Sequence, residues 1–214
     1  MCIRDSPSIL NVLSNLPFIL VGLLGLHRLT RINSLNIVSE NKLAYMALFF
    51  GTTLVTFGSG YYHLWPDNQT LVWDRLPMTI AFMGLFSIVI SEYISTRLGK
   101  ILLIPLLALG LLSVFYWHLT EANGQGDLRF YAFVQFFPIL AIPIILLTFK
   151  SSFSQTSGYW WLLVAYIAAK VFEHFDTEIH SLLVVVSGHS IKHVAAAIGV
   201  YILLRSYESR VEYA

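Results

Sequence analysis

The sequence has few charged residues. Only 12% of its 214 residues are Asp, Glu, Lys or Arg, whereas about 25% is usual in a soluble domain, and 57% are hydrophobic. So apolar a composition leaves too little polar surface for a water-soluble protein, and we expect the chain to lie in a lipid bilayer. The formal net charge is only +1. Without a basic stripe to neutralise phosphates, a nucleic-acid partner is excluded.

Cysteine is almost absent as well. The one thiol, Cys2, cannot form an internal disulfide. The N-terminus lacks the apolar core and the cleavage site of a signal peptide. We interpret residues 1–8, which begin MCIRDS, as a non-native or truncated leader. No repeat of 20–50 residues occurs, so we expect a single domain.

Long apolar stretches, by contrast, are abundant. Each is about 18–24 residues long, the length needed to cross a hydrocarbon core of about 30 Å as a helix. Short turn sequences such as WPDNQ and FDTEIH separate them. We predict an all-α membrane protein with seven transmembrane helices in one bundle over residues 9–205, followed by a cytoplasmic tail at 206–214. The predicted spans are 9–27, 43–65, 71–94, 100–118, 129–149, 158–176 and 183–204.

Lysine and arginine are distributed unequally between the two sides of this bundle. Eight of them fall in the first, third and fifth loops and the tail, whereas the other side has only Arg4 and Arg129 outside the spans. Positive charge is retained on the cytoplasmic side of membranes. We therefore predict that the N-terminus lies outside and the C-terminus inside.

Candidate chemistry is concentrated in two segments, SGYYH and SGHSIKH. Ser59 and His63 are four residues apart, as are His189 and His193, so each pair shares one helix face. Two imidazoles one turn apart can bind one metal ion, and a third from another helix completes a three-histidine site. The end of the second span and the start of the last lie on the same side. Asp74, at the start of the third span, lies on that side too.

Each of these residues also has a purely structural interpretation. A histidine in a membrane span commonly forms a hydrogen bond between helices, and Asp74 could cap a helix. Ser59 could be a small residue at a helix interface. By helical spacing, Arg75 and Lys192 are predicted to pair with acidic residues such as Glu173.

The order and spacing of these residues resemble a known superfamily. Ser-x-x-x-His, an aspartate eleven residues later, and His-x-x-x-His in the last span resemble the CREST superfamily of seven-helix membrane hydrolases. NVLSNLPF, YYHLWPDNQTLVWDRLPMT and SGHSIKHVAAA are similar to the bacterial branch of the alkaline ceramidase family, from Asn11 to about Arg205. The resemblance implies a zinc site at His63, His189 and His193, with Ser59 and Asp74 beside it.

It also implies a zinc-dependent hydrolase that cleaves the amide bond of a ceramide-like lipid to a sphingoid base and a fatty acid. Zinc would act there as a Lewis acid on water and on the carbonyl group. Asp74 would then act as general base and later as acid, and Ser59 would stabilise the developing oxyanion. We expect a bacterial inner-membrane protein with its site near the outer, periplasmic side.

Other interpretations remain open at this stage. A receptor or lipid-binding membrane protein of the same superfamily would keep the zinc without turnover, and a purely structural polar cluster would bind no metal. Eukaryotic members carry an acidic calcium-binding segment and a further acid three residues before the NxxSN motif. Ser8 occupies that position here, which puts calcium regulation in doubt. Nothing in the sequence indicates an oligomeric state.

Overall fold

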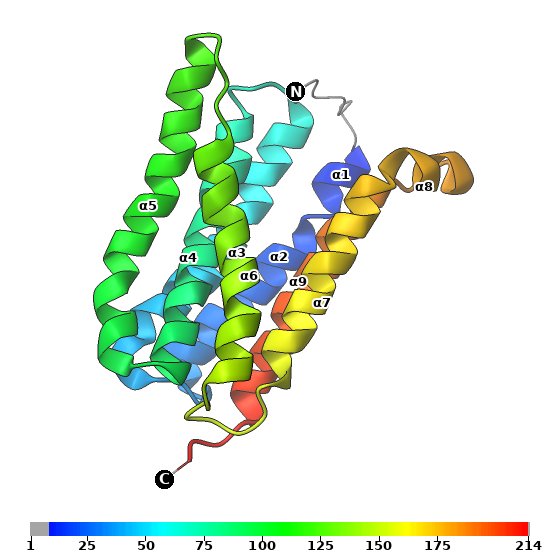
Figure 1. Cartoon of the computed structure of the whole chain (residues 1–214). Coiled ribbons are helices and arrows are strands. Elements are labelled where there is room, and N and C mark those ends of the chain that lie inside the picture. The colour runs from blue at the N-terminus through cyan, green and yellow to red at the C-terminus, as the bar shows by residue number, and fades with distance from the viewer. Residues whose placement is uncertain (1–8, 214) are drawn as a thin grey trace.

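A computed structural model describes residues 9–213, so the interpretation of residues 1–8 lies outside the described part. Nine α-helices and no β-strand occur in that part (Figure 1). The helices are α1 Ile9–Leu13, α2 Leu16–His27, α3 Lys42–Leu64, α4 Leu71–Tyr93, α5 Thr96–Ala122, α6 Arg129–Thr148, α7 Ser157–His174, α8 Asp176–Leu183 and α9 Gly188–Ser209. A π-helical turn, Arg28–Ile32, extends α2, and a 3₁₀ turn, Ser39–Asn41, precedes α3.

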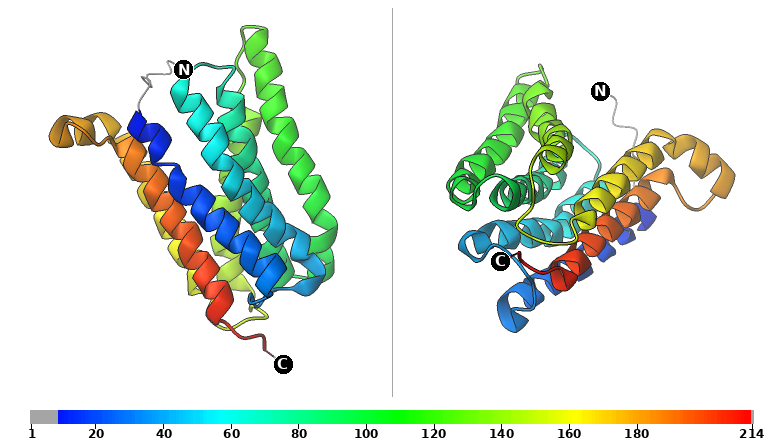
Figure 2. Two further views of the ribbon diagram at one scale, coloured as in Figure 1. Left: turned by 180° about the vertical axis from the view of Figure 1, so that it is seen from behind. Right: turned by 60° about the horizontal axis from the view of Figure 1, so that its bottom comes forward.

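The long helices form one bundle with α3 and α4 at its centre. Helix α2 packs against α3 and α9, helices α5 and α6 cover α4, and α7 lies along α9 (Figures 1 and 2). The beginnings of α1 and α9 lie at the same end of the bundle as the end of α3. This arrangement brings the segments SGYYH and SGHSIKH together at one end, which we call the polar end.

The helices that can cross a membrane agree with the predicted spans in position. Among the described residues, five helical segments are long and apolar enough, and α8 with α9 makes a sixth if that bent pair is one span. These findings identify an integral membrane protein. Helix α7 is less apolar because its last turns carry Lys170, Glu173 and His174.

The structure adds a break within the first predicted span and corrects the start of the last one. The first span is interrupted at Ser14 and Asn15, because the Asn15 side-chain amide donates to the Asn11 carbonyl at 2.7 Å and so competes with the backbone. FDTEIH is not a turn: it forms most of α8, and the last long helix begins at Gly188 rather than at 183.

A buried ion pair closes the opposite end of the bundle. The Arg210 guanidinium donates to both carboxylate oxygens of Glu92, at 2.6 and 2.9 Å, and both side chains are almost completely buried. The hydroxyls of Tyr45 and Tyr159 donate to the same carboxylate. Such pairing satisfies charges that would otherwise be very costly to bury, and it fixes the segment after α9 against α3, α4 and α7.

Candidate metal centre

Three histidine side chains meet at the polar end of the bundle. His63 comes from the last turn of α3, and His189 and His193 come from the first two turns of α9. All three are buried, and each offers a nitrogen within 4.8 Å of the nitrogens of the other two. The Nε2 atoms of His63 and His189 are 3.0 Å apart. The predicted meeting of these residues is therefore present in the structure, and the cluster could hold a metal ion.

The ring nitrogens of His193 have distinct partners. Its Nδ1 lies 2.8 Å from the Ser14 hydroxyl, whose oxygen is also 3.0 Å from the Asn11 carbonyl. Since a hydroxyl has one hydrogen and the carbonyl can only accept, Ser14 donates to Asn11 and accepts from His193 Nδ1–H. The proton on Nδ1 leaves the Nε2 lone pair of His193 free for a ligand bond, the arrangement usual for a metal-binding histidine.

The first turn of α9, which contains His189, is held from three directions. Ser187 caps the helix by accepting from the Ser190 amide, and Asp176 accepts from the His189 amide at 2.6 Å. The Asn11 side-chain oxygen accepts from the hydroxyls of both serines. These contacts fix the histidine pair of α9 relative to α1 and α8.

Sequence reasoning assigned no role to Asn11 and Ser14. Both lie in the NVLSN segment, where small polar residues interrupt an apolar span. That interruption was the one sign in the sequence that Asn11 and Ser14 have polar partners. The partners could not be read from it, because they belong to α9, about 180 residues away along the chain.

Ser59 and Asp74 lie together because α3 and α4 approach each other closely. A Cβ atom on Gly58 would lie only 2.0 Å from the carbonyl oxygen of Trp73, so glycine is required at this crossing. The buried Ser59 hydroxyl lies close enough to the half-buried Asp74 carboxylate to interact with it. Ser59 also precedes His63 by one turn of α3, which brings this pair beside the histidines.

The turn before α4 is closed by a different carboxylate. Asp67 accepts from the amides of Gln69 and Thr70 at 2.8 and 2.7 Å. The hydrogen bond from the Thr70 amide is the main cause of a lowered pKa at Asp67. Asp74 lies in the first turn of α4 with its side chain directed to Ser59, so the observed contacts do not support the capping interpretation of Asp74.

Of the two cations predicted to pair with acids, only one does so. Lys192 forms an ion pair with Glu173 at 2.7 Å, and Lys170 binds the other oxygen of the same carboxylate. The prediction is wrong for Arg75, whose guanidinium packs over the rings of Trp117 and Tyr131 at 4.3 and 4.8 Å. Cation–π contact stabilises this buried guanidinium, for which no ion pair is found among the described residues.

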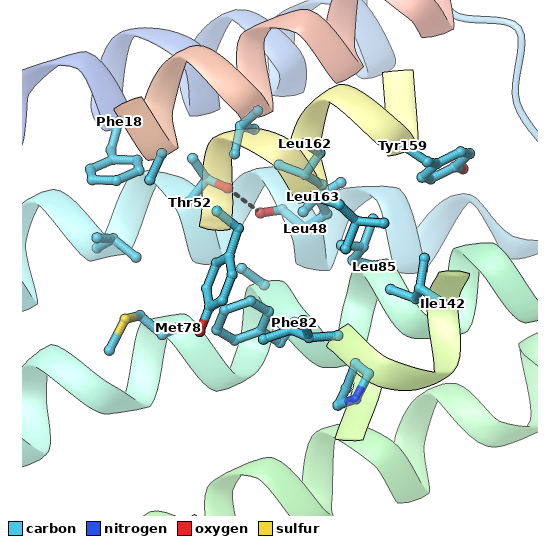
Figure 3. A pocket seen from close by; sticks show the side chains of 17 residues that line it. Phe18, Leu48, Thr52, Met78, Phe82, Leu85, Ile142, Tyr159, Leu162 and Leu163 are labelled. Carbon is cyan, nitrogen blue, oxygen red and sulfur yellow. Dashed lines mark hydrogen bonds between the residues drawn. The ribbon is translucent and has the colours of Figure 1, made fainter. Parts of the chain in front are cut away.

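An apolar cavity, whose lining is shown in Figure 3, has a volume of about 160 Å³ and begins one helical turn from the three-histidine cluster. Met78 lies one turn after Asp74 on α4, and Ala196 lies one turn after His193 on α9, and both line the cavity. Phe18 lines it too, and its ring packs edge-on against that of His193. From there the cavity extends between α3, α4, α6 and α7 to Ile142 and Tyr159.

Comparison with known proteins agrees with this geometry. The family model described as Ceramidase matches residues 6–210, nearly the whole chain. The chain belongs to the ceramidase family. No curated protein and no solved structure matches it. Membership in the ceramidase family implies an amidohydrolase. The buried three-histidine cluster lies within the region that the ceramidase model matches. Ser8, the position relevant to calcium, lies outside the described residues.

Proposed function

We propose that this protein is a zinc-dependent intramembrane amidohydrolase that cleaves a ceramide-like lipid to a sphingoid base and a fatty acid. One observation carries the proposal: three buried histidines and the neighbouring pair Ser59 and Asp74 lie at one end of a membrane bundle, where Phe18 of the apolar cavity packs against His193. The ceramidase family match supports the substrate class. We place the chain in the bacterial branch of that family, within the CREST superfamily.

His63, His189 and His193 would hold the zinc. Their nitrogens can reach one ion at the usual zinc–nitrogen bond length of about 2.0–2.1 Å with small side-chain adjustments, and the proton on His193 Nδ1 suits a ligand role. Three protein ligands leave a coordination position open, as in catalytic zinc sites. Bound zinc supplies Lewis acidity to water and to the substrate carbonyl.

Asp74 and Ser59 would carry out the proton transfer and stabilise the developing charge. The Asp74 carboxylate accepts a proton from the attacking water and returns it to the nitrogen of the leaving amine. The Ser59 hydroxyl holds that carboxylate in place, and it can rotate to donate a hydrogen bond to the developing oxyanion. Both roles suit side chains fixed by packed helices rather than by loops.

The cavity would take the acyl chain of the substrate. Its lining is almost entirely hydrophobic (Figure 3), and Phe18 at one end packs against His193. An acyl chain lying there would place its carbonyl next to the histidines and to Asp74. The lipid would enter laterally between helices, and its polar head would remain near the membrane surface.

Product formation tests this function. Purified protein in lipid vesicles should release fatty acid and sphingoid base in equal amounts from a ceramide, as measured by mass spectrometry. A chelator should abolish the release, and added zinc should restore it. Binding of zinc and ceramide without any product would identify a binding protein or receptor instead, and a protein without metal would leave only a structural role for the cluster.

We further propose that seven helices cross the membrane, with the histidine cluster near the outer, periplasmic surface of a bacterial inner membrane. The count of seven includes α7 and α9 as separate spans, because the two helices pack side by side along the length of the bundle. Residues 206–214 would then face the cytoplasm. The excess of lysine and arginine at the opposite end of the bundle from the cluster supports this orientation.

Cysteine labelling in intact cells tests the orientation. In a Cys2→Ser background, a Gln69→Cys variant should react with an impermeant maleimide from outside, because Gln69 is exposed in the α3–α4 turn. A Glu212→Cys variant, exposed near the opposite end, is the matched control and should react only after lysis. The reverse pattern would invert the topology.

A further inference from the structure

Helix α8 projects sideways from the polar end of the bundle (Figures 1 and 2). It is bent by 108° from α9 and, unlike the long helices, has no buried residue. Residues 184–187 connect it to α9, with Val184 at a positive φ of 61° in a tight turn that the Val185 amide closes by donating to the Leu183 carbonyl at 2.6 Å. A β-branched residue adopts this conformation only where its surroundings impose it, so the connection is a defined bend.

One side of α8 is apolar. Phe175, Ile179, Leu182 and Leu183 fall within an arc of about 100° when the helix is viewed along its axis, and the polar residues occupy the rest. Leu182 is 80% exposed and Val184 is 73% exposed. A soluble protein rarely leaves so many adjacent large apolar side chains uncovered, so this surface has a partner.

The apolar surface of α8 continues the lipid-facing side of α7. Val164, Ile167, Val171 and Phe175 follow one another at helical spacing on α7 and are each about half exposed. Phe175 is the junction between the two helices, so the bilayer that surrounds α7 is adjacent to α8. The last turns of α7 carry Lys170, Glu173 and His174, as expected where the hydrocarbon layer ends.

We propose that residues Phe175–Val186 form a membrane-surface insertion site. The apolar side of α8 and the valine run are buried at the boundary between lipid head groups and acyl chains, and the polar side of the helix faces water. The segment carries Asp176 and Glu178 and no lysine or arginine. Insertion is therefore driven by apolar burial and needs no anionic lipid.

This insertion site is joined to the first turn of α9. Asp176 accepts from the His189 amide at 2.6 Å, and a Cβ atom on Gly188 would lie 2.2 Å from the Phe172 carbonyl oxygen. The end of α7, the start of α8 and the start of α9 are therefore packed together. An inserted α8 fixes the depth of His189 relative to the membrane surface. The proposal concerns this surface alone and does not depend on metal binding or hydrolysis.

Depth-dependent quenching tests the proposal. In the full-length Cys2→Ser protein, Leu182→Cys and Thr177→Cys variants are each labelled with a nitrobenzoxadiazole dye and placed in phosphatidylcholine vesicles. Thr177 is exposed on the polar side of the same helix and is the matched control. The dye at Leu182 should emit at shorter wavelength than the dye at Thr177. Lipids with a doxyl group near the head group should quench the Leu182 dye at least about twofold more strongly than the Thr177 dye, as expected at a depth of about 5–10 Å.

Two outcomes would overturn the insertion site. If the dyes at both positions emit as in water, α8 lies outside the membrane. If the dye at Leu182 shifts to shorter wavelength but lipid quenchers do not reach it, protein covers this surface, and a second copy of the chain is its partner.

Discussion

Replacing Asp74 by asparagine should lower the rate of ceramide hydrolysis by about 10²–10⁴-fold, the usual contribution of a positioned acid or base. The reason is chemical rather than structural. Asparagine has the size of aspartate and can still accept a hydrogen bond from the Ser59 hydroxyl, but it cannot take up a proton. Metal content and melting temperature should therefore remain close to those of the parent protein. Product release and metal analysis on the same preparation measure both.

Asp67→Asn is the matched control for this experiment. It removes a carboxylate charge only seven residues away, but Asp67 is exposed and binds the amides of its own turn, which asparagine can also do. Its activity should remain within about twofold of the parent, because no proton transfer is assigned to it. Near-parental turnover by Asp74→Asn, with a ceramide that the parent cleaves, would remove Asp74 from the mechanism.

Replacing His193 by alanine should remove most of the bound zinc and with it the hydrolysis. The variant loses one of the three proposed ligands, and the two that remain come from different helices. Two imidazoles without the third form an incomplete site. Elemental analysis of the monodisperse fraction gives the zinc content, and circular dichroism confirms that the helices are retained.

His118→Ala is the control for loss of a histidine as such. His118 lies near the end of α5, is half-buried and is not part of the three-histidine cluster. This variant should keep about one zinc per chain. Full zinc occupancy in the His193→Ala variant would contradict the ligand assignment.

Most of the helices could be predicted from the sequence because each apolar stretch is long and ends at polar turn residues. Helix α8 could not. FDTEIH is short and polar, and its helical character depends on the leucines that follow it, which look like part of the next span. The break at Ser14 was equally difficult to predict, because it depends on a hydrogen bond from the Asn15 side chain to the preceding backbone.

The candidate site shows the same division. The spacing of His189 and His193 and the topology were enough to predict that they meet His63. The contact between Ser14 and His193 joins opposite ends of the chain, and no local pattern encodes it. Arg75 was misassigned because its partners are aromatic rings on α5 and α6 rather than an acid at helical spacing.

The buried pair of Glu92 and Arg210 has a consequence for biosynthesis. The two residues are 118 positions apart, so at 5–20 residues per second the ribosome adds the arginine roughly 6–24 s after the glutamate. Throughout that interval the carboxylate has no cation, and burying it among Tyr45 and Tyr159 would be strongly unfavourable. We therefore expect that the end of the bundle opposite the histidines is not sealed by this ion pair while α5–α9 are inserted. Closure of that end through this ion pair requires Arg210, so it follows the synthesis of α9.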